Sequence, residues 1–165
     1  MLKTISEVCE LEPNEIDIAI DGCGVPVFGL PIYNMAKAYS KLSYSSNNDE
    51  RTMTLQRIAS AMVDEPYYVA GTSRLDTILM EETKGKVLAK LGAESVYCMT
   101  IMDEGIGIAM KIEDGGYRAL DQVVPDLLIK HKFITSAEYE SIKKRLNLLI
   151  KNHRDQVVGY MKSVF

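Results

Sequence analysis

The fold is decided by a stretch in the second half of the chain, Val96-Tyr-Cys-Met-Thr-Ile-Met-Asp-Glu-Gly-Ile-Gly-Ile-Ala-Met-Lys-Ile112. Apolar and β-branched residues fill its two ends, and Asp103-Glu104-Gly105 between them is typical of a hairpin turn. From Ile106 to Ile112 every second residue is Ile or Met. This period of two indicates a strand with one buried face. The stretch therefore predicts antiparallel strands in a sheet formed within residues 85–113.

Helices are predicted on both sides of this sheet. Before it, apolar residues recur at intervals of three and four in 1–10, 31–42 and 49–65, and a short helix follows residues 72–77. After it, helices are predicted at 117–132 and 136–151. A further strand is predicted at 15–20, and the alternating tail 156–164 is expected to return to the sheet. We therefore expect one α/β (α+β) domain, residues 1–165, with helices packed on an antiparallel sheet.

The composition excludes two classes of partner. The chain has 165 residues and a formal net charge of -4, and its 19 Lys and Arg residues are scattered, so no basic nucleic-acid surface is expected. No apolar run is long enough to span a bilayer. The 3 cysteines are an odd number at scattered positions, and no signal-like segment precedes the first predicted helix. A reduced, cytoplasmic protein is the expectation.

The most unusual segment is Asp21-Gly-Cys-Gly-Val-Pro-Val-Phe-Gly-Leu-Pro31. Two glycines surround the cysteine and two prolines follow it, which predicts an irregular, rigid loop rather than a regular element. Cys23 is then either a small packed side chain, a nucleophile or a metal ligand. A Cys-His enzyme has little support, because both histidines, His131 and His153, lie on or beside charged helical stretches.

Three further residues carry alternative interpretations. The Asp21 carboxylate can accept backbone N–H groups in an Asx-type turn, or it can pair with the ammonium group of a substrate. Lys90 is either a surface charge or, within Lys90-Leu-Gly, a relative of the Lys-Thr-Gly box of serine acyl-transfer enzymes. Arg74 either forms a local ion pair with Asp76 in a turn or lines a substrate pocket.

The serine acyl-transfer enzymes also need a Ser-x-x-Lys motif. Its match here is Ser141-Ile-Lys-Lys144, which lies in the middle of a predicted helix on a charged face. This position is typical of a solvated helix surface rather than of a nucleophile.

Four blocks together resemble one family. They are the 21–31 segment, Val-Ala-Gly-Thr-Ser-Arg-Leu-Asp-Thr at 69–77, Lys-Leu-Gly-Ala-Glu at 90–94 and Gly-Ile-Gly-Ile-Ala-Met-Lys-Ile-Glu-Asp-Gly-Gly at 105–116. In this order and spacing they resemble the bacterial type II L-asparaginases, whose best-known members are the rhizobial thermolabile enzymes. Nearly the whole chain is covered, and it corresponds to the C-terminal half of a family member.

The resemblance implies a serine β-lactamase/glutaminase-like fold, here in a partial version, and hydrolysis of L-asparagine to L-aspartate and ammonia through an acyl-enzyme. It implies that Lys90 assists catalysis, that Asp21 lines the substrate pocket, and that Cys23 contributes to a zinc site. Arg74, in the second block, remains a further candidate for binding the substrate.

The sequence departs from the family pattern at several positions, and these departures change the activity that we expect. The nucleophilic Ser-x-x-Lys, a second active-site serine and the Cys-Ser-Gly-Lys-His block that completes the metal site belong to the family's N-terminal half. Ser73 and Ser95 stand at positions where the family has glycine. We therefore expect the 165 residues to be inactive alone, to need a partner chain carrying that half, to hold an incomplete zinc site and to form homo-oligomers. The alternative is a non-catalytic amino-acid-binding or regulatory module that keeps the fold.

Overall fold

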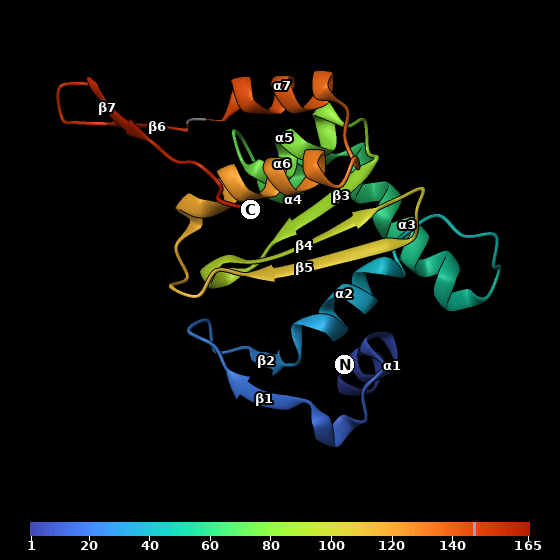
Figure 1. Ribbon diagram of the computed structural model, residues 1–165. Coiled ribbons are helices and arrows are strands. Elements are labelled where there is room, and N and C mark those ends of the chain that lie inside the picture. Colours follow the sequence, from blue (N-terminus) through green and yellow to red (C-terminus); the bar gives the residue numbers. More distant parts are fainter. Residues whose placement is uncertain (147) are drawn as a thin grey trace.

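The computed structural model describes residues 1–146 and 148–165, and its centre is a three-stranded antiparallel sheet (Figure 1). The strand order is β3 (Val87–Leu91), β4 (Val96–Ile101) and β5 (Ile106–Lys111). The register of β4 and β5 pairs Val96 with Lys111 and Ile101 with Ile106. Gly105 in the connecting turn has a φ of 69°, a left-handed conformation that glycine adopts without steric cost. The predicted hairpin and its antiparallel sheet are confirmed.

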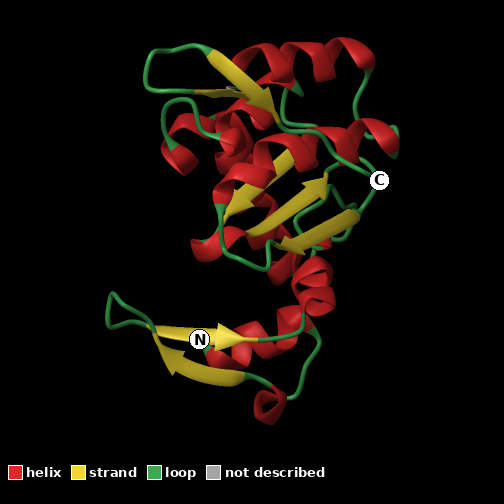
Figure 2. Cartoon of the chain, turned by 60° about the vertical axis from the view of Figure 1, so that its left-hand side comes forward, coloured by secondary structure: helices red, strands yellow, loops and turns green. Residues whose placement is uncertain are grey.

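Helices cover both faces of this sheet, as Figures 1 and 2 show. One face packs against α5 (Leu75–Glu82), α6 (Leu120–Lys130) and α7 (Ser136–Arg145), and the other against α2 (Ile32–Ser40) and α3 (Glu50–Asp64). Alternation along the strands supplies both interfaces, because neighbouring side chains point to opposite faces. In β3, for example, Val87 and Ala89 join the first core, whereas Leu88 joins the second.

The cap residues explain where two of the helices begin. The Asp49 side chain accepts a hydrogen bond from the Thr52 backbone N–H at the start of α3. Thr135 and Glu138 form a capping box at the start of α7. Both starts agree with the sequence predictions.

The crossing of α2 over the sheet is unusually close at Gly107 in β5. A Cβ atom added to Gly107 would lie 1.9 Å from the Ala36 carbonyl oxygen and 2.5 Å from the Ser40 backbone nitrogen. The helix backbone therefore rests on the strand backbone, with no space for any side chain between them. The glycine in Gly-Ile-Gly-Ile-Ala is thus required for packing.

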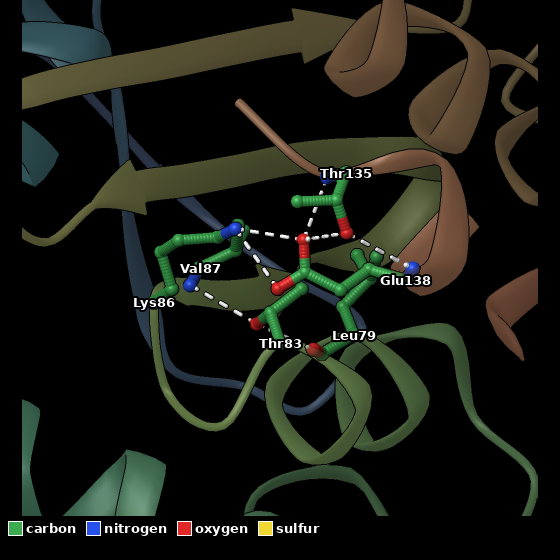
Figure 3. A network of polar contacts seen from close by, with 6 residues as sticks. All are labelled: Leu79, Thr83, Lys86, Val87, Thr135 and Glu138. Atoms are coloured by element: carbon green, nitrogen blue, oxygen red, sulfur yellow. Dashed lines mark hydrogen bonds and ion pairs between the residues drawn. The ribbon is translucent and has the colours of Figure 1, made fainter. Parts of the chain in front are cut away.

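A polar network fixes the beginning of β3 between α5 and α7 (Figure 3). The Lys86 Nζ atom donates to both carboxylate oxygens of Glu138, at 2.9 and 2.8 Å. The Thr83 hydroxyl donates to the Leu79 carbonyl oxygen at 2.7 Å and accepts from the Val87 N–H at 3.1 Å. Because Thr83 is buried, these bonds satisfy groups that have no access to water.

The N-terminal segment forms a smaller layer beneath α2 (Figures 1 and 2). It consists of α1 (Leu2–Cys9), the 3-10 turn η1 (Pro13–Glu15) and a hairpin of β1 (Asp17–Ile20) and β2 (Pro26–Gly29). The prediction that 21–31 contains no regular element was wrong for β2. Pro26 is tolerated there because it is the first residue of a strand in a two-stranded sheet.

The C-terminal predictions also need correction. The tail does not rejoin the central sheet, because β7 (Val157–Tyr160) pairs with β6 (Leu149–Lys151) in a separate two-stranded sheet. The last helix is shorter than the predicted 136–151, since Leu149–Lys151 is β6. Asn147, within the predicted range, lies outside the described residues.

The remaining elements are the short helix α4 (Pro66–Ala70) and the 3-10 turns η2 (Ala93–Ser95) and η3 (Tyr117–Ala119). Over residues 1–146 and 148–165, no helix has the length and hydrophobicity needed to cross a membrane.

Candidate functional site

Lys90 lies near the end of β3, on the edge of the central sheet. It is opposite Cys98 in the register with β4, and its side chain lies on the face turned toward α2. The Nζ atom donates one hydrogen bond, at 2.6 Å, to the backbone carbonyl of Leu91. An ammonium group has three protons, so this bond orients Lys90 and leaves two donors for another acceptor.

Two adjacent apolar cavities meet at Lys90. The first has a volume of about 470 Å³ and is lined by α1, β2 and α2 together with the ends of β3 and β4. The second has a volume of about 540 Å³ and is lined by α1, α2, α3 and α4. Lys90 is the one charged side chain among the described residues that line either cavity. A single cation among apolar walls is a suitable position for acting on a polar substrate group.

Burial alters the acidity of the groups around Lys90. Desolvation and, to a smaller extent, the neighbouring Cys9 together raise the pKa of the Cys98 thiol to about 11. Desolvation is also the main cause of the raised pKa of the Tyr39 hydroxyl. Both groups therefore remain protonated at neutral pH, and neither is suited to act as an anionic nucleophile.

The turn after Lys90 has an unusual backbone. Glu94 and Ser95 follow each other with φ values of 51° and 58°, both in the left-handed region. The Ser95 hydroxyl donates to the Gly115 carbonyl oxygen at 3.1 Å, and its residue is fully buried. Ser73 also has a positive φ of 57°. Both serines at expected glycine positions thus keep a conformation that favours glycine.

Asp21 and Cys23 occupy the tip of the β1–β2 hairpin. The Asp21 Oδ1 atom accepts backbone N–H groups from Cys23 at 2.8 Å and Val25 at 3.1 Å. This is the Asx-type turn that was one of the two interpretations of Asp21. Both residues are exposed, and Cys23 is a free thiol.

The turn and Lys90 are connected through β2 rather than by direct contact. Pro26, Val27 and Phe28 of β2 line the first cavity with Lys90, whereas Asp21 and Cys23 do not line it. The structure therefore brings the hairpin close to Lys90. The described lining of the cavity does not include the Asp21 carboxylate or the Cys23 thiol.

Arg74 lies in a different place from Lys90. It precedes α5 and lines a cavity of about 100 Å³ with Tyr97, Tyr117 and Asp121. The local ion pair with Asp76 is not observed among the described residues. Asp76 instead is buried, and its Oδ2 atom accepts a hydrogen bond from the Leu91 N–H at 2.9 Å. Arg74 is thus left available to line a pocket.

The sequence singled out Asp76 only together with Arg74, as an ion pair in a turn or as a pocket residue, and it missed Tyr97 as a site residue. Asp76 holds the backbone of the residue next to Lys90, and Tyr97 is fully buried. A carboxylate inside the apolar run Leu75-Asp-Thr-Ile-Leu-Met80 was the available signal, since a buried acid needs a specific partner. For Tyr97, nothing in the strand pattern separates it from ordinary core residues.

Comparison with known families is decisive. The family described as L-asparaginase II matches residues 1–163. The chain belongs to the L-asparaginase II family. A search of curated proteins finds no match. The family match confirms the resemblance drawn from the four sequence blocks, and it includes both the hairpin and the sheet that carries Lys90.

The incomplete zinc site expected from the resemblance stays a prediction for this L-asparaginase II member. Within the described ranges, no three His, Cys, Asp or Glu residues come together as a set of metal ligands. Near Cys23, the Asp21 Oδ1 atom is already engaged by backbone N–H groups. A structural zinc needs four ligands and a catalytic one needs three from protein. We therefore derive no catalytic step through a metal.

Proposed function

We propose that this protein contributes Lys90 and Asp21 to an amidohydrolase site that converts L-asparagine and water to L-aspartate and ammonia, whereas Arg74 lines a separate cavity. Membership of the L-asparaginase II family supports the substrate and the reaction. The observation that carries the proposal is the position of Lys90 as the one charged lining residue of two joined apolar cavities, among the described residues.

Lys90 would act on the charge that forms during amide cleavage. Attack on the carboxamide carbon places negative charge on its oxygen, and the nitrogen must gain a proton before it leaves as ammonia. A fixed ammonium group can stabilise the first and supply the second. The hydrogen bond to the Leu91 carbonyl holds the Nζ atom in place for either role.

The nucleophile would come from a polypeptide segment outside these 165 residues. Neither cavity at Lys90 has a serine among its described lining residues. Ser141 of the Ser-x-x-Lys match is held by Glu82, on the face of the sheet opposite to Lys90. We propose the serine β-lactamase-like fold for the assembled site, with this chain as one part of it. Cys23 would add one ligand to any zinc completed from outside.

The direct test measures ammonia released from L-asparagine by the protein alone and by the protein mixed with a polypeptide that carries the family's Ser-x-x-Lys segment. We expect release only from the mixture, and replacing that serine with alanine should abolish it. Release by the 165 residues alone would contradict the need for an external nucleophile. The absence of release from every such mixture would contradict the hydrolase proposal.

The absence of a serine beside Lys90 in the described structure also supports a second candidate, an amino-acid-binding or regulatory module. This module would bind L-asparagine or L-aspartate without turnover. Calorimetry that detects neither ligand would count against it.

Apolar side chains on the N-terminal layer support association with another chain. Among them Ile20 is 66% exposed and Ile18 is 55% exposed, and both lie on the short sheet of β1 and β2. We propose that this surface is covered in homo-oligomers or by the nucleophile-bearing segment. Sedimentation velocity should show association that Ile20→Lys weakens, whereas a monodisperse monomer at all concentrations would contradict it.

A further inference from the structure

A small polar cavity lies on the opposite face of β3 from Lys90. It has a volume of about 100 Å³ and is formed between the start of α5, the ends of β3 and β4, and the η3–α6 segment. Leu91 lines both this cavity and the first cavity at Lys90, but the other described lining residues of the two cavities differ, and Tyr97 and Leu120 belong to the core on the opposite face of the sheet. This cavity is therefore distinct from the two that meet at Lys90.

Two polar atoms at this place have no partner in the described structure. The Tyr97 hydroxyl and the Asp76 Oδ1 atom are buried and make no hydrogen bond there. Tyr97 is fully buried and lines the cavity, and Asp76 is 2% exposed. Desolvation raises the pKa of the Tyr97 hydroxyl strongly, and the adjacent Asp76 carboxylate is the next cause, so these two side chains lie beside each other at the edge of the cavity. Leaving a buried polar group unpaired is costly, so the site is suited to a bound partner.

Opposite charges line the same cavity. Asp121 is half-buried, and no described residue forms an ion pair or a hydrogen bond with its carboxylate. Burial raises the pKa of the Asp121 carboxyl, and the positive charge of Arg74 partly opposes this rise, so the two charges lie close enough to interact. Arg74 is exposed, whereas Tyr97 is buried. The cavity thus has a cation near solvent, the Asp121 carboxylate in its wall and Tyr97 at its buried end.

We propose that this cavity binds a small zwitterionic α-amino acid. Arg74 would bind the carboxylate through its planar guanidinium group. Tyr97 and Asp121 would accept hydrogen bonds from the ammonium group, with Asp76 near the Tyr97 hydroxyl. A cavity volume of about 10–15 Å³ is enough to hold one water molecule. The cavity of about 100 Å³ is therefore larger than one water needs, and it suits a small amino acid. This second site lies beyond the proposed hydrolytic site and does not depend on it.

Coupling between the two sites would pass through Asp76. Its Oδ1 atom is unpaired near Tyr97, while its Oδ2 atom accepts the N–H of Leu91, the residue after Lys90. The Asp76 carboxylate would therefore lie between an amino acid bound at the second cavity and the end of the strand that carries Lys90.

Isothermal titration calorimetry with L-asparagine and glycine tests the site directly, with acetamide as a probe that lacks both charges. We expect both amino acids to bind and acetamide not to bind. Arg74→Gln should weaken binding at least about tenfold, and Tyr97→Phe about threefold to tenfold. Arg118→Gln is the matched control, since Arg118 lines a different cavity, and it should change binding less than about twofold.

Three results would overturn the proposal. The first is that neither amino acid binds to the folded protein. The second is that neither Arg74→Gln nor Tyr97→Phe changes the binding. The third is that Lys90→Gln abolishes binding while Arg74→Gln keeps it. Circular dichroism establishes that each variant is folded. Ammonia release is measured separately, in the mixture with the Ser-x-x-Lys segment, so loss of amino-acid binding in Arg74→Gln with release retained, or binding retained with no release from any mixture, makes the two proposals fail separately.

Discussion

The central sheet and the β1–β2 hairpin carry the two parts of the proposed site, and they are held in place by different means. Lys90 is on a strand whose neighbours Leu88 and Ala89 are completely buried, and whose start is tied to α5 and α7. Asp21 and Cys23 are on a hairpin in which all four residues of β1 are exposed. The sheet is therefore stabilised by the protein's own core, while the hairpin depends on its turn and on whatever covers it.

The largest contrast is expected at two glycines. Gly107→Ala places a Cβ atom 1.9 Å from the Ala36 carbonyl oxygen, so α2 must move away from β5. We expect a loss of about 3 kcal/mol in the free energy of unfolding, at the upper end for an overpacked core site. Gly22→Ala, with no atom within 4 Å and no positive φ, should change it by less than about 0.5 kcal/mol. Urea denaturation measures both, and equal losses would show that the contrast between the regions is wrong.

The next contrast concerns side chains that accept backbone N–H groups. Thr83→Val removes the buried acceptor of the Val87 N–H and should lower the free energy of unfolding by about 2 kcal/mol. Asp21→Ala removes the acceptor of the Cys23 and Val25 N–H groups at an exposed turn. We expect it to speed amide hydrogen exchange at Cys23 and Val25 without moving the global denaturation midpoint. A large shift of that midpoint in Asp21→Ala would mean that the hairpin is part of the cooperative core.

A smaller effect of opposite sign is expected at Ser73. Its φ of 57° is in the left-handed region, where a residue with a Cβ atom is strained. Ser73→Gly should raise the free energy of unfolding by about 1 kcal/mol. Thr72→Gly is the control, because Thr72 has no positive φ and glycine there only adds freedom to the unfolded chain. If both substitutions destabilise the protein equally, the Ser73 backbone is not strained.

The sequence was most informative where one local signal determined the structure. The turn at Gly105 and the alternation that follows predicted the β4–β5 hairpin, and the predicted ranges 49–65 and 136–151 place the starts of α3 and α7 correctly. It failed at the C-terminus, because a short alternating strand does not show which strand it will pair with. There β7 pairs with β6 instead of the central sheet.

The candidate site was only partly predictable for the same reason. Lys90 and Asp21 belong to short motifs, so the sequence could single them out. Their relation to the rest of the site depends on contacts between distant residues. Asp76 reaches Leu91, 15 residues away, and Arg74 and Lys90 line cavities on opposite sides of β3. Neither the Asp76–Leu91 contact nor the separation of Arg74 from Lys90 can be predicted from the spacing of these residues along the chain.

The measurement that tests the central claim most directly is ammonia release from L-asparagine by Lys90→Gln, compared with Lys111→Gln, in the mixture with the Ser-x-x-Lys segment. Both lysines lie toward the ends of strands in the same sheet, and each donates to the carbonyl of the following residue, but only Lys90 lines the two apolar cavities among the described residues. We predict that Lys90→Gln lowers kcat/KM about 100-fold or more, while Lys111→Gln stays within about twofold of the unmodified protein. Equal rates for the two variants would contradict the assignment of Lys90 to catalysis.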